Sequence, residues 1–170
     1  MKKTLIGLMA IAVATFAFIA NSNTSEAAPV FASGAQTVRG CGHVVHQDVS
    51  VQDMQDNFII STPALPAVGG LYCNTSGMCY TDCETQWELD AKAAENQLET
   101  NMGFSYMIYE IKVNQLANAT CSVVSAQYPG IENDYVNQVN GHIAVYEEAL
   151  EQANEDFCEC VKNCEGCECE

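Results

Sequence analysis

Positive charge is the scarcest feature of this sequence. Its 170 residues include only 6 Lys and Arg against 22 Asp and Glu, for a formal net charge of −16 at pH 7. Because nucleic-acid backbones and anionic lipid surfaces are themselves negative, a chain this acidic is not expected to bind either of them. The partners that remain plausible on charge alone are divalent cations and a basic protein surface.

The common catalytic motifs are also missing. The sequence contains no G-x-S-x-G elbow, phosphate-binding loop, dinucleotide fingerprint or H-E-x-x-H pair. No glutamate stands three residues before any of the three histidines, as a di-iron helical bundle would require. We therefore expect neither an enzyme nor a resident cofactor.

Only one long apolar run is present, and it lies at the N-terminus. Lys2 and Lys3 precede an apolar stretch over residues 5–20, which is shorter than the ~20 residues that span a bilayer. Ser25 and Ala27 then offer the small residues that a signal peptidase reads. This pattern predicts a signal peptide over residues 1–27, no membrane insertion after its removal, and a secreted or periplasmic protein. Cleavage would bring the net charge to −17, because two lysines and one glutamate are lost.

Cysteine, in contrast, is abundant. All ten cysteines follow the predicted signal peptide, and they are Cys41, Cys73, Cys79, Cys83, Cys121, Cys158, Cys160, Cys164, Cys167 and Cys169. An even number of cysteines in an exported chain predicts a set of disulfide bonds.

Two apolar stripes with helical spacing follow residue 82. The first contains Trp87, Ala91, Ala94, Leu98, Met102, Tyr106, Tyr109, Val113, Leu116, Thr120 and Val123, and the second contains Ile131, Tyr135, Val139, His142, Tyr146, Leu150, Ala153, Phe157 and Val161. Thr81 or Asp82 could cap the first helix, and Tyr128-Pro129-Gly130 separates the stripes. The sequence thus predicts an all-α fold, an elongated antiparallel hairpin of two or three long helices over residues 82–163 that turns at 128–130.

The two arms of such a hairpin would differ in length. About 46 residues precede this turn and only about 33 follow it, at a rise of ~1.5 Å per residue. Gly103 is the weak point of the first stripe, since glycine in a helix costs ~1 kcal/mol relative to alanine. We therefore expect either a bend near Gly103 or an overhanging first segment.

Two irregular segments flank the hairpin. Residues 28–81 contain cysteines, prolines and glycines, and we expect them to wrap along the helices, with a short helix over about residues 51–59. Residues 164–170 form a tail rich in cysteine and glutamate.

Matching spacings predict how the helix ends are joined. An antiparallel hairpin brings Cys79-x-x-x-Cys83 beside Cys160-x-x-x-Cys164, and residues four apart share one helix face. Pairing across the helices then joins Cys83 to Cys160 and Cys79 to Cys164. The layout is similar to the twin CX3C hairpins of small mitochondrial intermembrane-space proteins. Their connection is far shorter, so the resemblance implies the geometry and no kinship.

The other cysteines are less constrained. Cys121 lies near the predicted turn, where Cys41 is the obvious candidate to reach it. Cys73, Cys158, Cys167 and Cys169 then remain, with three possible connectivities. Neither Cys158-x-Cys160 nor Cys167-x-Cys169 should close on itself, because so tight a ring strains the bond.

Metal binding by thiolates is the main alternative. The tail cysteines, Cys158, Cys160, Cys164, Cys167 and Cys169, have a density that looks like a metallothionein, and thiolates suit zinc or copper(I). Metallothioneins intersperse lysine, whereas this tail intersperses glutamate, which would add negative charge to a thiolate cluster. Disulfides are therefore the favoured interpretation. Cys164-Glu-Gly-Cys167 could also form a redox pair, although neighbouring glutamates would raise its thiol pKa.

Histidine offers a second metal candidate. His43 and His46 follow Cys41 closely enough to supply part of a site, but short H-x-x-H pairs are frequent by chance. His142 falls on the second apolar stripe, where a packed, hydrogen-bonded residue is expected.

Glutamates at steps of four form a ladder along the second helix. Its members are Glu147, Glu151, Glu155 and Glu159, and each like-charge pair costs ~0.2–0.5 kcal/mol. A solvated face is the simplest explanation, and neutralisation by calcium or a basic partner is the alternative. We expect an exported structural or protein-interaction module, with metal sequestration and thiol redox chemistry as alternatives. A homodimer that covers the remaining apolar face is also expected.

Overall fold

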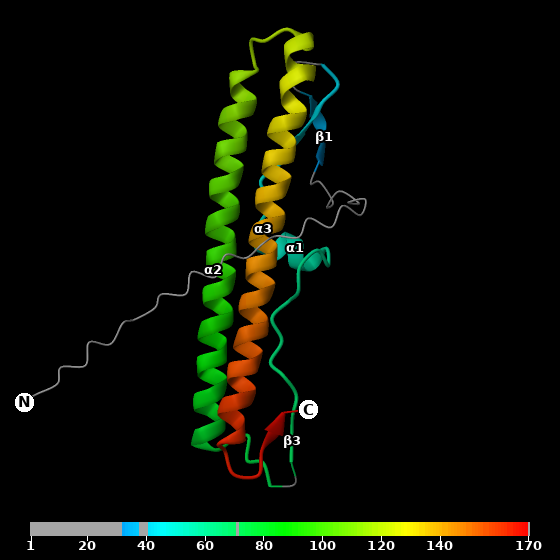
Figure 1. Ribbon diagram of the computed structural model, residues 1–170. Helices are drawn as coiled ribbons and strands as arrows, with labels where there is room; N and C mark the ends of the chain where they lie inside the picture. Colours follow the sequence, from blue (N-terminus) through cyan, green and yellow to red (C-terminus); the bar gives the residue numbers. More distant parts are fainter. Residues whose placement is uncertain (1–31, 38–40, 71, 170) are drawn as a thin grey trace, which may run out of the picture.

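Two long antiparallel helices dominate the computed structural model, which describes residues 32–37, 41–70 and 72–169 (Figure 1). The elements are β1 (Ala32–Thr37), β2 (Val44–His46), α1 (Val51–Asp56), β3 (Val68–Gly69), α2 (Met78–Gln115), α3 (Cys121–Lys162) and β4 (Glu168–Cys169). The predicted all-α hairpin is confirmed. The predicted signal peptide lies outside the described residues.

The turn of the hairpin is not at residues 128–130, and this prediction was wrong. α2 ends with Leu116 as its C-cap, and α3 begins after the N-cap Thr120, so the connection spans residues 116–120. Pro129 and Gly130 lie inside α3. Within the connection, the backbone N–H groups of Leu116, Ala117 and Ala119 each donate to a carbonyl three residues earlier.

The new position of the turn removes the mismatch in arm length. α2 has 38 residues and α3 has 42, so neither arm overhangs the other. α2 runs through Gly103 without a break, and a Cβ at Gly103 would meet open space. The expected bend or overhang was therefore wrong, because it followed from misplacing the turn.

The start of α2 also differs from prediction. Gly77 is its N-cap, in place of Thr81 or Asp82, and the Gly77 N–H donates to the Asn74 carbonyl at 2.8 Å in the preceding turn. Thr81 lies one turn inside the helix, where its hydroxyl donates to the Gly77 carbonyl. This earlier start places Cys79 on the same helix as Cys83.

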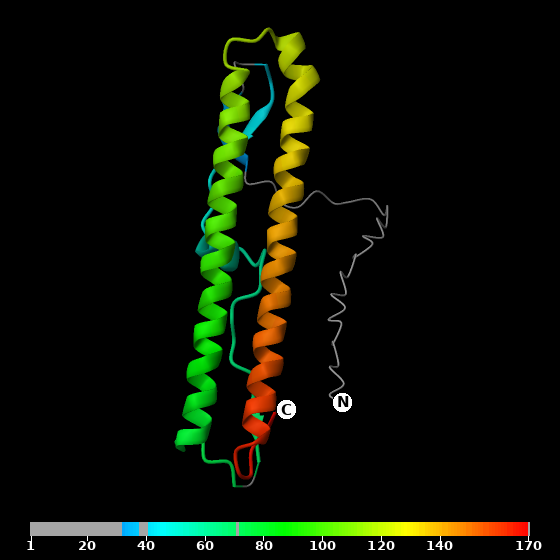
Figure 2. The ribbon, with the colours of Figure 1, turned by 60° about the vertical axis from the view of Figure 1, so that its left-hand side comes forward.

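The core lies along the seam between the helices and under residues 41–70, which we call the wrap. Most positions of both predicted stripes are buried, whereas Thr120 and Val123 are exposed because the chain turns beside them. From the wrap, Val49, Val51, Met54 and Ile60 are buried against the hairpin, and Met54 is 0% exposed. The wrap lies along one side of the two helices (Figures 1 and 2).

Short regular elements order the wrap. α1 has a capping box, in which the Ser50 hydroxyl accepts from the Asp53 N–H and the Asp53 side chain accepts from the Ser50 N–H. It ends at Asp56, a little short of the predicted residue 59. β1 pairs with β2, and β3 pairs with β4 from the tail, both antiparallel.

Two glycines let the wrap and the tail cross closely. Gly70 has φ +126° and Gly166 has φ +77°, both in the region that glycine adopts most readily. A Cβ on Gly70 would overlap the Gly166 carbonyl oxygen, and one on Gly166 would lie 2.8 Å from Tyr72 Cβ. The tail can therefore fold back onto β3.

Candidate functional site

Two stacked disulfides fasten the open end of the hairpin. Cys79 is bonded to Cys164 and Cys83 to Cys160, with Cα–Cα distances of 5.7 and 5.8 Å. These are the pairs expected from the two CX3C spacings in an antiparallel arrangement. We call this pair of bonds the clasp.

Three further disulfides join the flanking segments to the hairpin or to each other. Cys41 is bonded to Cys121 beside the turn, as expected, with a Cα–Cα distance of 5.4 Å. Among the three connectivities left open, the structure has Cys73 with Cys167 and Cys158 with Cys169. All ten cysteines lie in the described part of the chain, and all ten are in disulfides. Such a set is typical of proteins from an oxidising compartment.

The predicted metal-binding cysteines are all in these bonds. Cys158, Cys160, Cys164, Cys167 and Cys169 each have a disulfide partner, and Cys164 and Cys167 are bonded to different cysteines. Within the described residues, Cys79, Cys83 and Cys164 form a group of three possible ligands, whose sulfur atoms all lie within 4.8 Å of one another. A disulfide sulfur is not a thiolate, so this group could hold a metal only after reduction.

The two histidines of the H-x-x-H pair have separate environments. His43 Nε2 lies 3.4 Å from the Ser125 hydroxyl, whereas His46 is buried and its Nε2 lies 3.2 Å from a Glu132 carboxylate oxygen. Among the described residues, neither histidine belongs to a group of three possible ligands. Burial lowers the pKa of His46 below 6.5, against the opposing effect of Glu132.

Tyrosine hydroxyls bind the backbone of the wrap to the helices. Tyr109 accepts from the His46 N–H at 3.0 Å and bonds with the Tyr128 hydroxyl at 2.9 Å, while Tyr128 donates to the Val44 carbonyl. Farther along, Tyr146 donates to the Ser61 carbonyl at 2.9 Å. Tyrosine hydroxyls are protonated at neutral pH, and burial raises the pKa of all three still further. His142 is likewise hydrogen-bonded, to Ser105 at 3.0 Å.

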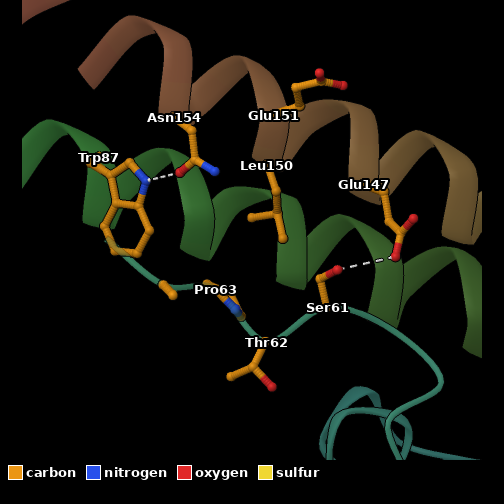
Figure 3. Close-up of a pocket in the computed structure, with 9 residues that line it drawn as sticks. Ser61, Thr62, Pro63, Trp87, Glu147, Leu150, Glu151 and Asn154 are labelled. Atoms are coloured by element: carbon orange, nitrogen blue, oxygen red, sulfur yellow. Dashed lines mark hydrogen bonds between the residues drawn. The ribbon is translucent and has the colours of Figure 1, made fainter. Parts of the chain in front are cut away.

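An open cleft of about 370 Å³ lies where the wrap passes over the middle of the clasped half (Figure 3). We call it the wrap cleft. The wrap supplies Ser61, Thr62, Pro63 and Ala64, α2 supplies Trp87, and α3 supplies Glu147, Leu150, Glu151 and Asn154. Residues from three separate parts of the chain therefore form one site.

The indole of Trp87 has a fixed position in this cleft. Its Nε1–H donates to Asn154 Oδ1 at 2.8 Å, which ties α2 to α3 across the seam. Pro63 and Leu150 lie between Trp87 and the carboxylates in Figure 3. The cleft therefore offers apolar walls, and a hydrogen bond holds one of them, the Trp87 indole, in place.

The carboxylates are at the other end of the cleft. Glu147 points toward the wrap and accepts from the Ser61 hydroxyl at 3.3 Å, whereas Glu151 points outward at the rim (Figure 3). No lysine or arginine is among the residues that line the cleft, so no basic side chain of the lining neutralises this negative charge. The site suits the (CH₂)ₙ stem of a long side chain together with its positively charged end.

The sequence pointed to only part of this site. The spacing of the glutamate ladder marked Glu147 and Glu151, and the apolar stripe marked Trp87 and Leu150 as core residues. Residues 61–64 carry no motif. Their place in the cleft depends on Tyr146 of α3, whose hydroxyl donates to the Ser61 carbonyl and accepts from Gln55 of the wrap. That contact joins residues far apart in sequence, so no local pattern predicts it.

The comparisons with known proteins found no matching family model, no matching curated protein and no matching solved structure. Within the described residues, no helix is long and apolar enough to cross a membrane. Fold and site together define the class: a disulfide-clasped antiparallel helical hairpin with an N-terminal wrap.

Proposed function

We propose that this chain is an exported protein-interaction module whose wrap cleft receives a lysine or arginine side chain from a basic partner. The observation that carries the proposal is the cleft itself, which has the Glu147 carboxylate at one end and apolar walls that include Trp87 and Leu150. Export is supported by the predicted signal peptide over residues 1–27 and by the five disulfides.

Charge favours a cationic occupant over other ligands. The chain has a net charge of −16, so an anionic ligand would be repelled on approach and a cationic one attracted. A long basic side chain can place its methylenes against apolar walls and its charge beside a carboxylate. A calcium ion, by contrast, takes six to eight oxygen ligands, whereas only Glu147 and Glu151 contribute carboxylates to this cleft.

Tryptophan fluorescence tests this proposal directly, because Trp87 is the only tryptophan in the chain. The mature protein would be titrated with a lysine-rich decapeptide, with a glutamate-rich decapeptide as the control ligand. We expect a saturable change in Trp87 emission with the basic peptide alone, weakened by added salt.

Two matched variants distinguish binding in the wrap cleft from general attraction of a basic peptide to an acidic protein. Glu147→Gln keeps an oxygen for the Ser61 hydroxyl and removes the charge, and it should weaken binding by about 3–10-fold, the effect of losing about 1 kcal/mol. Glu159→Gln, on the same ladder but outside the cleft, should leave the affinity nearly unchanged. An unchanged Trp87 emission, or equal effects of both variants, would refute the proposal.

Metal sequestration is the second candidate, supported by the mutual closeness of the Cys79, Cys83 and Cys164 sulfur atoms. It requires reduced cysteines, since only the thiolate binds zinc or copper(I) strongly. Thiol titration and zinc analysis of the freshly isolated protein distinguish the two candidates. Free thiols together with bound zinc would favour sequestration, and their absence would favour the oxidised interaction module.

A further inference from the structure

An exposed aromatic residue follows the end of α1, at a position where glycine is the usual residue. Phe58 has a φ of +58°, and it is the one non-glycine residue with a positive φ among the described residues. Bulky side chains rarely adopt this left-handed region. The Phe58 side chain is also 95% exposed. Phenylalanine therefore has an unfavourable backbone conformation here and an apolar ring in water.

Hydrogen bonds fix this backbone conformation. The Phe58 N–H donates to the Gln55 carbonyl at 3.0 Å, and the Ile59 N–H donates to the Met54 carbonyl at 2.9 Å. These two bonds form the Schellman motif that ends many helices, and Phe58 has the position in which glycine predominates. Met54 and Ile60 are buried on either side of it. The exposed ring therefore projects from an anchored loop.

Folding does not account for phenylalanine at this position. Glycine would relieve the backbone, a polar side chain would suit the exposure, and the Phe58 ring is not part of the hydrophobic core. Residues that the surrounding structure holds in a strained conformation cluster at binding sites. Aromatic side chains are also enriched in protein interfaces. Strain and exposure are independent observations, and both favour a contact with another molecule.

Phe58 lies close to the wrap cleft. It precedes Ser61 by three positions, so their Cα atoms are at most about 11 Å apart. In Figure 3 the chain runs from α1 to Ser61 at the carboxylate end of the cleft, where the Ser61 hydroxyl donates to Glu147. Asp56 on α1 is exposed as well, and residues 40–91 contain no Lys or Arg. The ring therefore belongs to an acidic surface that continues the cleft.

We propose that Phe58 is the apolar anchor of this docking surface, which binds a partner segment with an apolar side chain about three residues from the basic side chain that enters the wrap cleft. The inference rests on the proposed function, because it takes the cleft as the site of the basic side chain. An extended segment advances about 3.3 Å per residue, so three residues can span the distance from Ser61 to Phe58. The partner is thus recognised by a basic and an apolar side chain together.

Two decapeptides of equal charge test the anchor in the mature protein, with Trp87 emission as the measurement. One peptide has a leucine three residues after a lysine, and the other has alanine in place of the leucine. Wild type should bind the leucine peptide about 5–10-fold more tightly, because leucine has more apolar surface to remove from water.

Matched variants assign this preference to the Phe58 ring. Phe58→Ala should bind both peptides alike, with the affinity that wild type has for the alanine peptide. Phe104→Ala removes a ring that is 59% exposed on α2, outside the cleft, and it should keep the wild-type preference.

A further variant tests the strain separately from the ring. Phe58→Gly also lacks the ring but suits the left-handed φ, so it should lose the leucine preference as Phe58→Ala does. Its melting temperature should exceed that of Phe58→Ala by about 2–6 °C. A melting temperature below that of Phe58→Ala would overturn the argument from strain.

Failure of the anchor can be distinguished from failure of the cleft. If neither peptide changes the Trp87 emission of wild type, the proposed function itself is refuted. If both peptides bind wild type with equal affinity, or if Phe58→Ala keeps the leucine preference, the cleft remains the binding site and the anchor at Phe58 is overturned.

Discussion

Buried polar side chains hold the wrap to the helices. His46 is the one buried histidine of the described residues, and it lies among the rings of Tyr109 and Tyr135, with centroids 5.4 Å away in both cases. Its Nε2 faces Glu132 on α3, and its backbone N–H binds Tyr109 on α2. One residue of the wrap therefore contacts both arms of the hairpin.

The burial of His46 predicts a pH-dependent contribution to stability. Because its pKa is lowered in the folded protein, the unfolded chain binds the proton more tightly below pH 6.5. The contribution of neutral His46 is thus complete above pH 6.5 and is lost as the pH falls, by up to about 1.4 kcal/mol per pH unit. Urea unfolding of wild type and His46→Gln at several pH values measures it. We expect the free energy of unfolding of the wild type to fall relative to that of the variant below pH 6.5.

A second variant gives the sign of the Glu132 interaction. Glu132 opposes the lowering of the His46 pKa, so Glu132→Gln should lower that pKa further and steepen the loss of stability at acidic pH. The account would be contradicted if the free energy of unfolding of wild type, relative to that of His46→Gln, stayed constant or grew as the pH falls.

At the scale of single elements, α3 contains the residues that looked most like a turn. Proline within a helix costs ~3 kcal/mol because it lacks an N–H and its ring clashes with the preceding turn. The neighbouring Tyr128 is 1% exposed and donates to the Val44 carbonyl, and Val124 is also buried. Cys121 at the start of α3 is bonded to Cys41. These long-range contacts favour a helix at Pro129 in spite of its cost.

Substitutions at residues 129 and 130 distinguish a helix from a turn. A Cβ at Gly130 would meet nothing within 4 Å, and its φ is not positive, so Gly130→Ala should stabilise the protein by about 0.5–1 kcal/mol. Pro129→Ala should stabilise it by up to about 3 kcal/mol. Gly166→Ala is the matched control and should destabilise, because Gly166 has φ +77° and closely approaches Tyr72. Thermal unfolding measures all three, and destabilisation by Gly130→Ala would contradict the helical assignment.

The sequence was informative where structure follows from periodicity and local spacing. Two helical stripes and two CX3C motifs were sufficient to predict an antiparallel hairpin and the clasp pairs, since both depend on which residues share a helix face. The turn was misplaced because residues 116–120 contain neither proline nor glycine, whereas Pro129 and Gly130 have the usual turn composition. The mismatch in arm length was the available signal, and equal arms require a turn near residue 118. The wrap cleft depends on contacts between distant residues, which no local pattern records.

On the scale of the whole molecule, disulfides hold both ends of a long two-helix rod. A layer of only two helices buries little apolar surface, and the wrap supplies part of what is missing on one side. The clasp and the Cys73–Cys167 and Cys158–Cys169 bonds fix the open end, and Cys41–Cys121 fixes the wrap beside the turn. The rod therefore presents the wrap cleft on the side that the wrap covers.

Mapping the disulfides of the denatured, unreduced mature protein by mass spectrometry tests this arrangement most directly. Chymotryptic cleavage after Tyr80 separates Cys79 from Cys83, and tryptic cleavage after Lys162 separates Cys160 from Cys164. The antiparallel clasp predicts a fragment with Cys79 linked to one with Cys164, and Cys83 linked to Cys160. A bond within either CX3C motif, or the crossed pairs Cys79–Cys160 and Cys83–Cys164, would contradict it.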